Sequence, residues 1–171
     1  NGGMVTFVGR VLTPNSPRKF VTVGSQSAAY SLAMGRVMLA DLASDDLDEV
    51  IEDFEFRPLT PHTTTSRSEL LEELAWVRRS GFAVEREQTY LGMGCVAVPI
   101  SDDEGRVMAA ISASEEVHKL TPQRVETLRS ELMRVIPAIK KRILPSHRSG
   151  AVSLRGRSQT VRTASLENAD S

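Results

Sequence analysis

The sequence holds little of several features on which particular protein classes depend. Cys95 is the single cysteine among 171 residues, which excludes an internal disulfide, and one cysteine with three histidines lacks the paired spacing of a zinc site. Lysine and arginine (21) nearly balance aspartate and glutamate (22), so the net charge of −1 gives no overall attraction to DNA or to a membrane surface. No apolar run approaches the roughly 20 residues that cross a bilayer. We therefore expect a protein of a reducing cytoplasm, without metal, cofactor or membrane partner.

A hydrophobic content of 40 % is ordinary for one globular domain, and the spacing of the apolar residues predicts its elements. In chain order these are strands within 4–12 and 19–24, helices within 31–42, 44–57 and 67–80, a strand at 82–87, a hairpin within 92–114 and a helix from 122. This order is neither a βαβ alternation nor an all-β pattern. It predicts an α+β fold with a central, mostly antiparallel sheet flanked by helices.

Several helix ends carry capping residues. Ser31 is the expected N-cap of the nearly all-apolar helix 31–42. Ser66 and Glu69 form a capping box for the third helix, and Gly81 is placed to end it. Thr121, followed by a proline, is placed to start the last helix. Residues 145–171 show no periodicity and are rich in Ser and Arg, so we expect a disordered, mildly basic tail after a domain at 1–144.

The predicted hairpin has one face with almost no large side chain. The turn composition of 102–105 predicts that Ser101 pairs with Arg106, and this register places Cys95 opposite Ser112. The residues that then share the face are Met93, Cys95, Ala97, Ala110, Ser112 and Ser114. Such a face either lets a helix pack close to the sheet or floors a cavity for a small acid, with the first N–H groups of helix 31–42 favouring an anion there.

Two further candidates for chemistry are open. Cys95 is a possible nucleophile, but catalysis needs a base beside the sulfur, and nothing in the sequence brings His62, His118 or His147 to it. Glu85 and Glu87 share one face of the predicted strand, either as paired carboxylates for acid–base work or as solvated charges at a sheet edge. The threonines within 60–66 are interpreted as turn formers. We therefore expect no catalytic residue and no enzyme activity.

Four stretches, taken in order, point to a known family. They are "AYSLAMGRVMLADL", "TPHTTTSRSELLEELAWVRRSGFAVEREQ", "LGMGCVAVPISDDEGRVMAAISAS" and the last helix. From about Met4 to Leu144 the chain resembles the effector-binding domain of IclR-type bacterial transcriptional regulators. The resemblance implies a GAF-like sensor fold. The segments "VGRV", "VTVG" and "YSLAMGRVMLA" are most similar to the subgroup that controls catabolism of aromatic acids, such as the protocatechuate and 4-hydroxybenzoate branches.

The resemblance also implies a ligand site. In the family the effector is held by an acid after the "GFA" strand, a cysteine ten positions on, two serines in the next strand and backbone at the start of the apolar helix. The matching residues here are Ala33, Met34, Glu85, Cys95, Ser112 and Ser114. Glu85 departs from the pattern, because Asp is commoner at this position, and the longer acid would shrink or re-aim the pocket.

The expected function is to sense a small carboxylate, with an aromatic-acid catabolite as the favoured class, for a cytoplasmic bacterial regulator. The family binds operator DNA through an N-terminal winged helix-turn-helix, which we expect this chain to lack, since it starts at the first sensor strand. The resemblance further implies homo-dimers or tetramers. Two alternatives stand beside this function: an enzyme of unknown reaction that uses Cys95 or Glu85, and a purely structural oligomerisation module.

Overall fold

The computed structural model describes residues 3–12 and 21–143. Its elements follow the predicted order, with two short 3-10 helices added. They are β1 (Met4–Thr6), β2 (Gln26–Ala28), α1 (Ala33–Asp41), α2 (Ser44–Glu52), α3 (Arg67–Ser80), β3 (Ala83–Arg86), β4 (Met93–Ser101), β5 (Val107–Glu116) and α4 (Pro122–Ile143). Every strand pairing is antiparallel, in a two-stranded sheet β1-β2 and a three-stranded sheet β3-β4-β5. The α+β class is confirmed, whereas the predicted tail lies outside the described residues.

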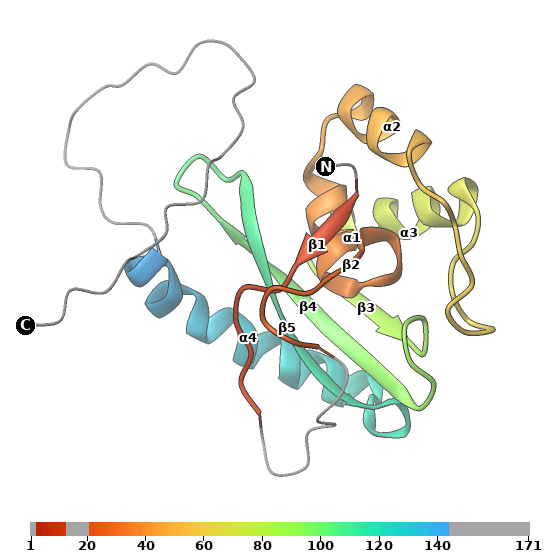
Figure 1. Ribbon diagram of the computed structural model, residues 1–171. Helices are drawn as coiled ribbons and strands as arrows, with labels where there is room; N and C mark the ends of the chain where they lie inside the picture. The colour runs from red at the N-terminus through yellow and green to blue at the C-terminus, as the bar shows by residue number, and fades with distance from the viewer. Residues whose placement is uncertain (1–2, 13–20, 144–171) are drawn as a thin grey trace, which may run out of the picture.

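The three-stranded sheet lies between helices (Figure 1). One face packs on α4 through a cluster of large apolar side chains that includes Val96, Val98, Leu128 and Leu132. The other face packs on α1, and α3 lies against α1 through Val77. Because α1 is covered by the sheet on one side and by α3 on another, it is buried nearly all round, which explains why its sequence is almost wholly apolar.

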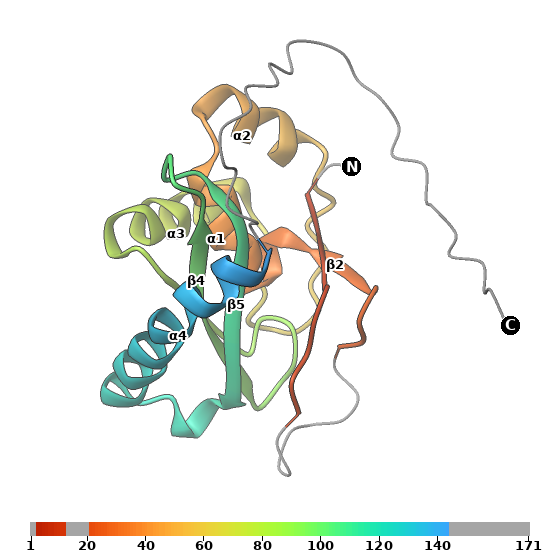
Figure 2. The same ribbon diagram turned by 90° about the vertical axis from the view of Figure 1, so that its left-hand side faces the viewer.

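The β1-β2 pair is a separate ribbon beside α1, away from the three-stranded sheet (Figure 2). The predicted strand at 19–24 is wrong in position: among its described residues the chain turns at Gly24, whose φ is +88°, and strand β2 begins only at Gln26. The Ser25 hydroxyl donates to Thr22 O at 2.7 Å and holds this turn. The valine of that turn, Val23, is therefore exposed rather than paired.

Two of the three helix starts predicted from capping residues are confirmed. The Ser66 hydroxyl accepts from Glu69 N–H at 3.3 Å at the start of α3, and Gly81 ends this helix with φ +76°. Thr121 Oγ1 accepts from the third residue of α4, Arg124, at 3.2 Å. Ser31 is not an N-cap: it belongs to a short 3-10 turn, Ala29–Ser31, and its hydroxyl donates to Ala28 O. The N-cap position of α1 is therefore Leu32, one residue later than predicted.

The β4-β5 hairpin has the predicted strands but a different register. Cys95 lies opposite Ser114, not Ser112, and Ser112 lies opposite Ala97. Asp102 Oδ1 accepts N–H bonds from Glu104 and Arg106, which extends the turn by one residue, and a bulge after Ile100 adds another. Beyond the bulge the total shift of two residues leaves the side chains on their predicted faces, because side chains alternate with period two. Val107, which lies between the turn and the bulge, is shifted by one residue and packs on the α1 side instead.

Candidate functional site

The sheet face turned toward α1 is lined by small side chains. Ala83 and Ala97 are fully buried there and pack in one cluster with Ala33 and Val37 of α1. With only methyl groups between them, the helix comes close to the sheet. At these positions the small residues therefore serve close helix packing, the first of the two interpretations open from the sequence.

On the same face, the side chains next to Ala97 toward the start of β4 are less buried. Cys95 and Ser112 are half-buried and Ser114 is exposed. The Cys95 sulfur lies 3.3 Å from the Ser114 hydroxyl oxygen, and Ser112 also bonds to the thiol. Three of the six predicted site residues thus meet at one place, which stays accessible because no large side chain on this face covers it.

The start of α1 adjoins this place. Ala33 and Met34 belong to the cluster that contains Cys95. The preceding residue, Leu32, offers no side-chain cap, and the first bond within the helix is donated by Arg36 N–H to Leu32 O at 3.0 Å. The N–H groups of Ala33 and Met34 therefore have no acceptor within the helix, which gives this end partial positive charge.

A glycine makes this approach possible. At Gly35 an added Cβ would lie 2.1 Å from Ala29 O and 2.4 Å from Ala29 Cα. No larger residue fits without moving the 3-10 turn that precedes the helix. Gly35 therefore fixes how the chain enters α1 and, with it, where the helix start lies relative to the sheet.

Glu85 lies opposite Cys95 on β3 and faces the same place. Its side chain is only 6 % exposed, so the interpretation as a solvated edge charge is wrong. Burial raises the pKa of Glu85 to about 7, against the lowering effects of the Gln88 N–H bond and the Arg36 charge. Glu87 does not continue the strand: β3 ends at Arg86, and Glu87 turns the chain with φ +57°.

The surroundings of Cys95 do not suit nucleophilic catalysis. Burial raises the pKa of its thiol, and the bonds from Ser114 and Ser112 only partly oppose that rise. His62 lies 3.7 Å from a carboxylate oxygen of Glu87 and His118 lies 3.5 Å from Glu116, so each faces an acid instead of the sulfur. His147 is outside the described residues. A neutral thiol without a base is a poor nucleophile.

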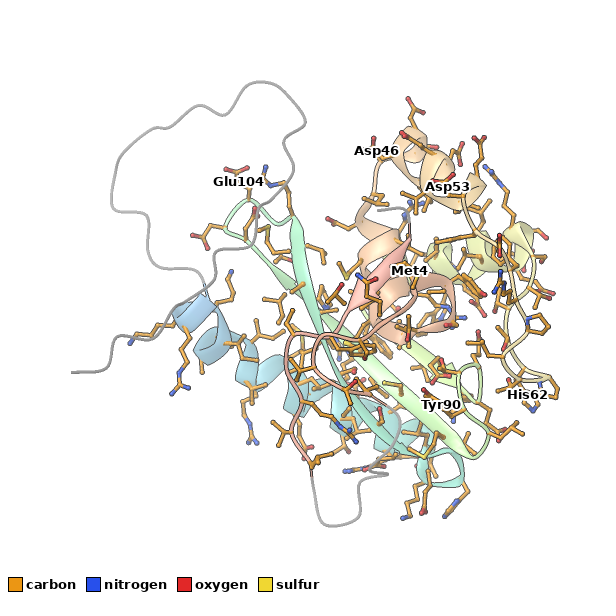
Figure 3. All side chains as sticks on the ribbon, in the orientation of Figure 1. Met4, Asp46, Asp53, His62, Tyr90 and Glu104 are labelled. Carbon is orange, nitrogen blue, oxygen red and sulfur yellow. The ribbon has the colours of Figure 1, made fainter. Side chains whose placement is uncertain are left out.

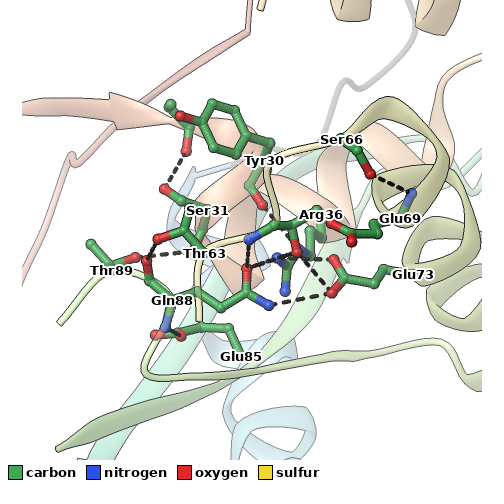
Figure 4. A network of polar contacts seen from close by, with 12 residues as sticks. Tyr30, Ser31, Arg36, Thr63, Ser66, Glu69, Glu73, Glu85, Gln88 and Thr89 are labelled. Carbon is green, nitrogen blue, oxygen red and sulfur yellow. Dashed lines mark hydrogen bonds and ion pairs between the residues drawn. The ribbon is translucent and has the colours of Figure 1, made fainter. Parts of the chain in front are cut away.

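A buried polar network behind Glu85 is the part of the site that sequence reasoning missed (Figure 4). Arg36 of α1 is 2 % exposed, and its Nη2 lies 2.9 Å from Glu73 Oε2 of α3. The same guanidinium donates to Tyr30 O at 3.0 Å, to Thr64 Oγ1 at 3.3 Å and to Gln88 Oε1. The signal was present, since Arg36 is the one charged residue in the middle of an otherwise apolar helix.

The network joins two loops to the helices. Gln88 N–H donates to Glu85 Oε2 at 2.9 Å, and Gln88 Oε1 accepts from Thr64 N–H at 3.2 Å. Thr63 Oγ1 donates to Gln88 O at 2.7 Å and also accepts from Thr60 N–H within its own turn. The threonines are turn formers as predicted, but their hydroxyls also hold the segment that follows β3 in place over the site.

An open hollow of about 360 Å³ lies on the outer side of this network. Its lining is Pro61, His62, Thr63, Thr64, Glu69, Glu72, Glu73 and Gln88. It is at the end of the molecule marked by His62 and Tyr90, opposite the hairpin turn at Glu104 (Figure 3). None of the six predicted site residues lines it, and the Gln88 residue, which binds Glu85, separates the two places.

Two classes of site receive no support from the described residues. Within 3–12 and 21–143, no group of three or more His, Cys, Asp or Glu side chains is arranged to hold a metal ion. In the same part of the chain, no helix has both the length and the apolar character needed to cross a membrane.

Comparison with known proteins identifies the family to which this fold belongs. The family model described as "Bacterial transcriptional regulator IclR C-terminal" matches residues 1–140. Among curated proteins, the regulator XynR of Escherichia coli K12 is 30 % identical over 119 residues, 70 % of this chain and 47 % of XynR. The repressor AllR of the same strain is 31 % identical over 124 residues, 72 % of this chain and 46 % of AllR. The chain thus spans about half the length of the curated relatives it matches.

Solved structures of IclR-type regulators have a fold similar to that of this chain. IclR of Thermotoga maritima is 29 % identical, with a TM-score of 0.77 over 84 % of this chain and 58 % of that one. The inducer-binding domain of PobR from Acinetobacter, solved as a double mutant with 3-hydroxybenzoic acid, is 26 % identical, with a TM-score of 0.69 over 81 % of this chain and 82 % of that one. The chain belongs to the IclR C-terminal family of bacterial transcriptional regulators.

Proposed function

We propose that this chain is the effector-sensing domain of a transcriptional regulator and that it binds a small carboxylate at the small-residue face. The observation that carries the proposal is one convergence of groups: a buried carboxyl, a thiol and two hydroxyls lie on one sheet face beside an uncapped helix start. A few converging polar groups on a floor of small side chains are typical of small-molecule sites. The residues are Ala33, Met34, Glu85, Cys95, Ser112 and Ser114.

The favoured effectors are aromatic acids. The PobR inducer-binding domain, with which this chain shares its fold at 26 % identity, was solved with 3-hydroxybenzoic acid. The effector's carboxylate would accept from the N–H groups of Ala33 and Met34, where the helix start favours an anion. Its ring would lie over Cys95 and Ser112, where small side chains leave room.

The regulator as a whole would act in the cytoplasm as a homo-dimer or tetramer. Operator DNA would be bound by a helix-turn-helix domain in another part of the regulator. This proposal is consistent with the match, which covers about half the length of the curated relatives. Effector binding would change the affinity of the regulator for DNA only through a difference in affinity between two conformations or assemblies. No cofactor is part of this proposal.

Enzyme activity is the weaker reading. The raised thiol pKa of Cys95 and the acid partners of His62 and His118 leave the sulfur without an activating base. The relatives named above are regulators by name. Glu85 has no second carboxylate beside it on the strand, because the chain turns away at Glu87.

Thermal unfolding with a panel of carboxylates tests the proposal. Pyruvate, benzoate, 3-hydroxybenzoate and 4-hydroxybenzoate cover short-chain and aromatic acids. A ligand at one hundred times its Kd should stabilise the native chain by about 2.7 kcal/mol. Ser112→Leu should abolish this shift by filling the space, and Ser130→Leu, on the exposed face of α4, should retain it.

The possible outcomes separate the proposed functions. Stabilisation by one acid class that Ser112→Leu removes supports a sensor. No stabilisation by any acid of the panel contradicts it and favours a structural module. Turnover of an acid that Cys95→Ser removes, with binding intact, would establish the enzyme reading instead.

A further inference from the structure

Glu85 is a buried acid with an incomplete set of hydrogen bonds. Its Oε2 accepts one bond, from Gln88 N–H at 2.9 Å. Among residues 3–12 and 21–143, no hydrogen-bond partner is found for Oε1 of this 6 % exposed side chain. Oε1 is not among the fully buried side-chain atoms that lack a partner, so it is the edge of this carboxyl group that a ligand could reach. The free oxygen belongs to a residue that faces Cys95, at the centre of the proposed effector site.

The charges around Glu85 leave it poorly compensated. From α1, Arg36 acts on it, but Arg36 lies 2.9 Å from Glu73 of α3 and is buried against that acid. After β3, Glu87 adds a repulsive charge. The titratable group on β4 is the Cys95 thiol, which burial keeps neutral, and β5 presents only the hydroxyls of Ser112 and Ser114.

A bound carboxylate would make this imbalance worse if Glu85 were ionised. Two carboxylates held together away from water repel strongly, and such pairs in proteins share one proton, so that one member is an acid and the other an anion. The effector's own carboxylate lies near the N–H groups of α1, which favour its charged form. The shared proton should therefore stay on Glu85.

We propose that Glu85 enters the effector complex as a neutral carboxyl group, whose Oε1–H donates a hydrogen bond to the carboxylate of the effector, so that binding above neutral pH takes up one proton from solvent. This inference rests on the proposed function and adds how the site accepts an anion although the Arg36 charge is already paired with Glu73. No covalent bond forms or breaks apart from the protonation of Glu85, and the proton comes from water or buffer. The regulator's affinity for its effector then depends on pH.

The raised pKa of Glu85 is consistent with its neutral form in the effector complex. Its pKa of about 7 means that free Glu85 is mostly neutral at about pH 6 and mostly ionised at about pH 8. Effector binding should therefore take up almost no proton at the lower pH and approach one proton per site at the higher. The apparent Kd should rise about tenfold between those two values, since each pH unit above the pKa of the free group costs a factor of ten.

Titration calorimetry of the whole chain with 3-hydroxybenzoate tests this directly. At each pH the measurement is made in two buffers with different ionisation enthalpies, and the difference in heat gives the number of protons taken up. Where 3-hydroxybenzoate does not bind, the acid of the panel that does bind replaces it. Because the proton count is measured on the unaltered chain, no variant has to fold for the test to work.

A pair of variants sharpens the result. Glu85→Gln places a permanent N–H donor of the same shape at the site, so the variant should bind with the low-pH affinity at both pH values and with no proton uptake. Glu49→Gln removes a charge from the exposed side of α2 and should keep the proton uptake and the tenfold change. Glu85→Ala should lose affinity at both pH values.

Each outcome decides the inference. Proton uptake that Glu85→Gln abolishes establishes it. Binding that is independent of pH, or that survives in the unaltered chain with no proton uptake at about pH 8, overturns it and leaves the proposed function standing. Failure of every acid of the panel to bind removes the proposed function and this inference with it.

Discussion

The two faces of the β3-β4-β5 sheet are built on opposite principles. Toward α4, large side chains such as Val96 and Val98 are fully buried against helix residues of similar size. On the face toward α1, alanines at one end let the helix lie close to the sheet, and at the other end the side chains around Glu85 are polar. Close packing of large apolar groups contributes stability, whereas a face of small and polar groups contributes less and leaves room for chemistry. One face of the sheet thus supports the fold, and the other carries the proposed effector site.

The same charge placed on the two faces gives the largest contrast. Val98→Asp puts an unpaired carboxylate into the α4 cluster and should cost on the order of 5 kcal/mol, comparable with the whole stability of a domain of this size. Ser114→Asp, on the exposed end of the other face, should cost less than about 1 kcal/mol. Urea unfolding followed by circular dichroism measures both. A cooperative, nearly unchanged transition for Val98→Asp would show that this face is not the main core.

The buried network should be the next most sensitive part. Arg36→Met removes the cation that faces Glu73 and leaves that acid partly buried without its partner, at a cost of about 3 to 4 kcal/mol. Arg67→Met breaks an exposed ion pair with Asp48 and should cost less than about 1 kcal/mol. Comparison of the two unfolding midpoints isolates burial as the cause. Equal losses would mean that the Arg36 ion pair is no more important than a surface pair.

Stability should also depend on pH through Glu85, on the face of the proposed effector site. The folded-state pKa of Glu85, about 7, is above its unfolded value, so the folded chain holds a proton that the unfolded chain loses between these two values. The free energy of unfolding should therefore fall as the pH rises from about 4.5 to about 7, by on the order of 2 to 3 kcal/mol. In Glu85→Gln this part of the pH dependence should vanish. Unfolding curves that shift equally with pH in both proteins would contradict the shifted titration.

The smallest effect is expected at Cys95. Cys95→Ser keeps the size of a half-buried side chain and its bond to Ser114, so stability should change by less than about 1 kcal/mol and effector binding should be largely retained. Because burial raises the thiol pKa, alkylation of the unaltered chain by iodoacetamide at neutral pH should be slow and should quicken as the pH rises. A rapid reaction at neutral pH would show an activated thiol and would reopen the enzyme reading.

Local sequence was enough to locate most helices and strands. The capping box at Ser66, the glycine at Gly81 and the proline after Thr121 act within a few residues, so their structural outcome does not depend on distant parts of the chain. The alternation along the hairpin likewise kept Cys95, Ser112 and Ser114 on one face even though their register moved by two. Ordered motifs, read together, identified the family.

Long-range packing decided what the residues of the site became. Whether Glu85 is solvated or buried depends on two other segments. Helix α1 lies far from it in sequence, and the segment around Gln88 packs on it after β3 has ended. The side chain of Arg36 has no partner within its own helix; Glu73, Thr64 and Gln88 reach it from three other segments. Burial and charge pairing are properties of surroundings assembled from the whole chain, so residue type and spacing alone could name Glu85 but could not set its protonation.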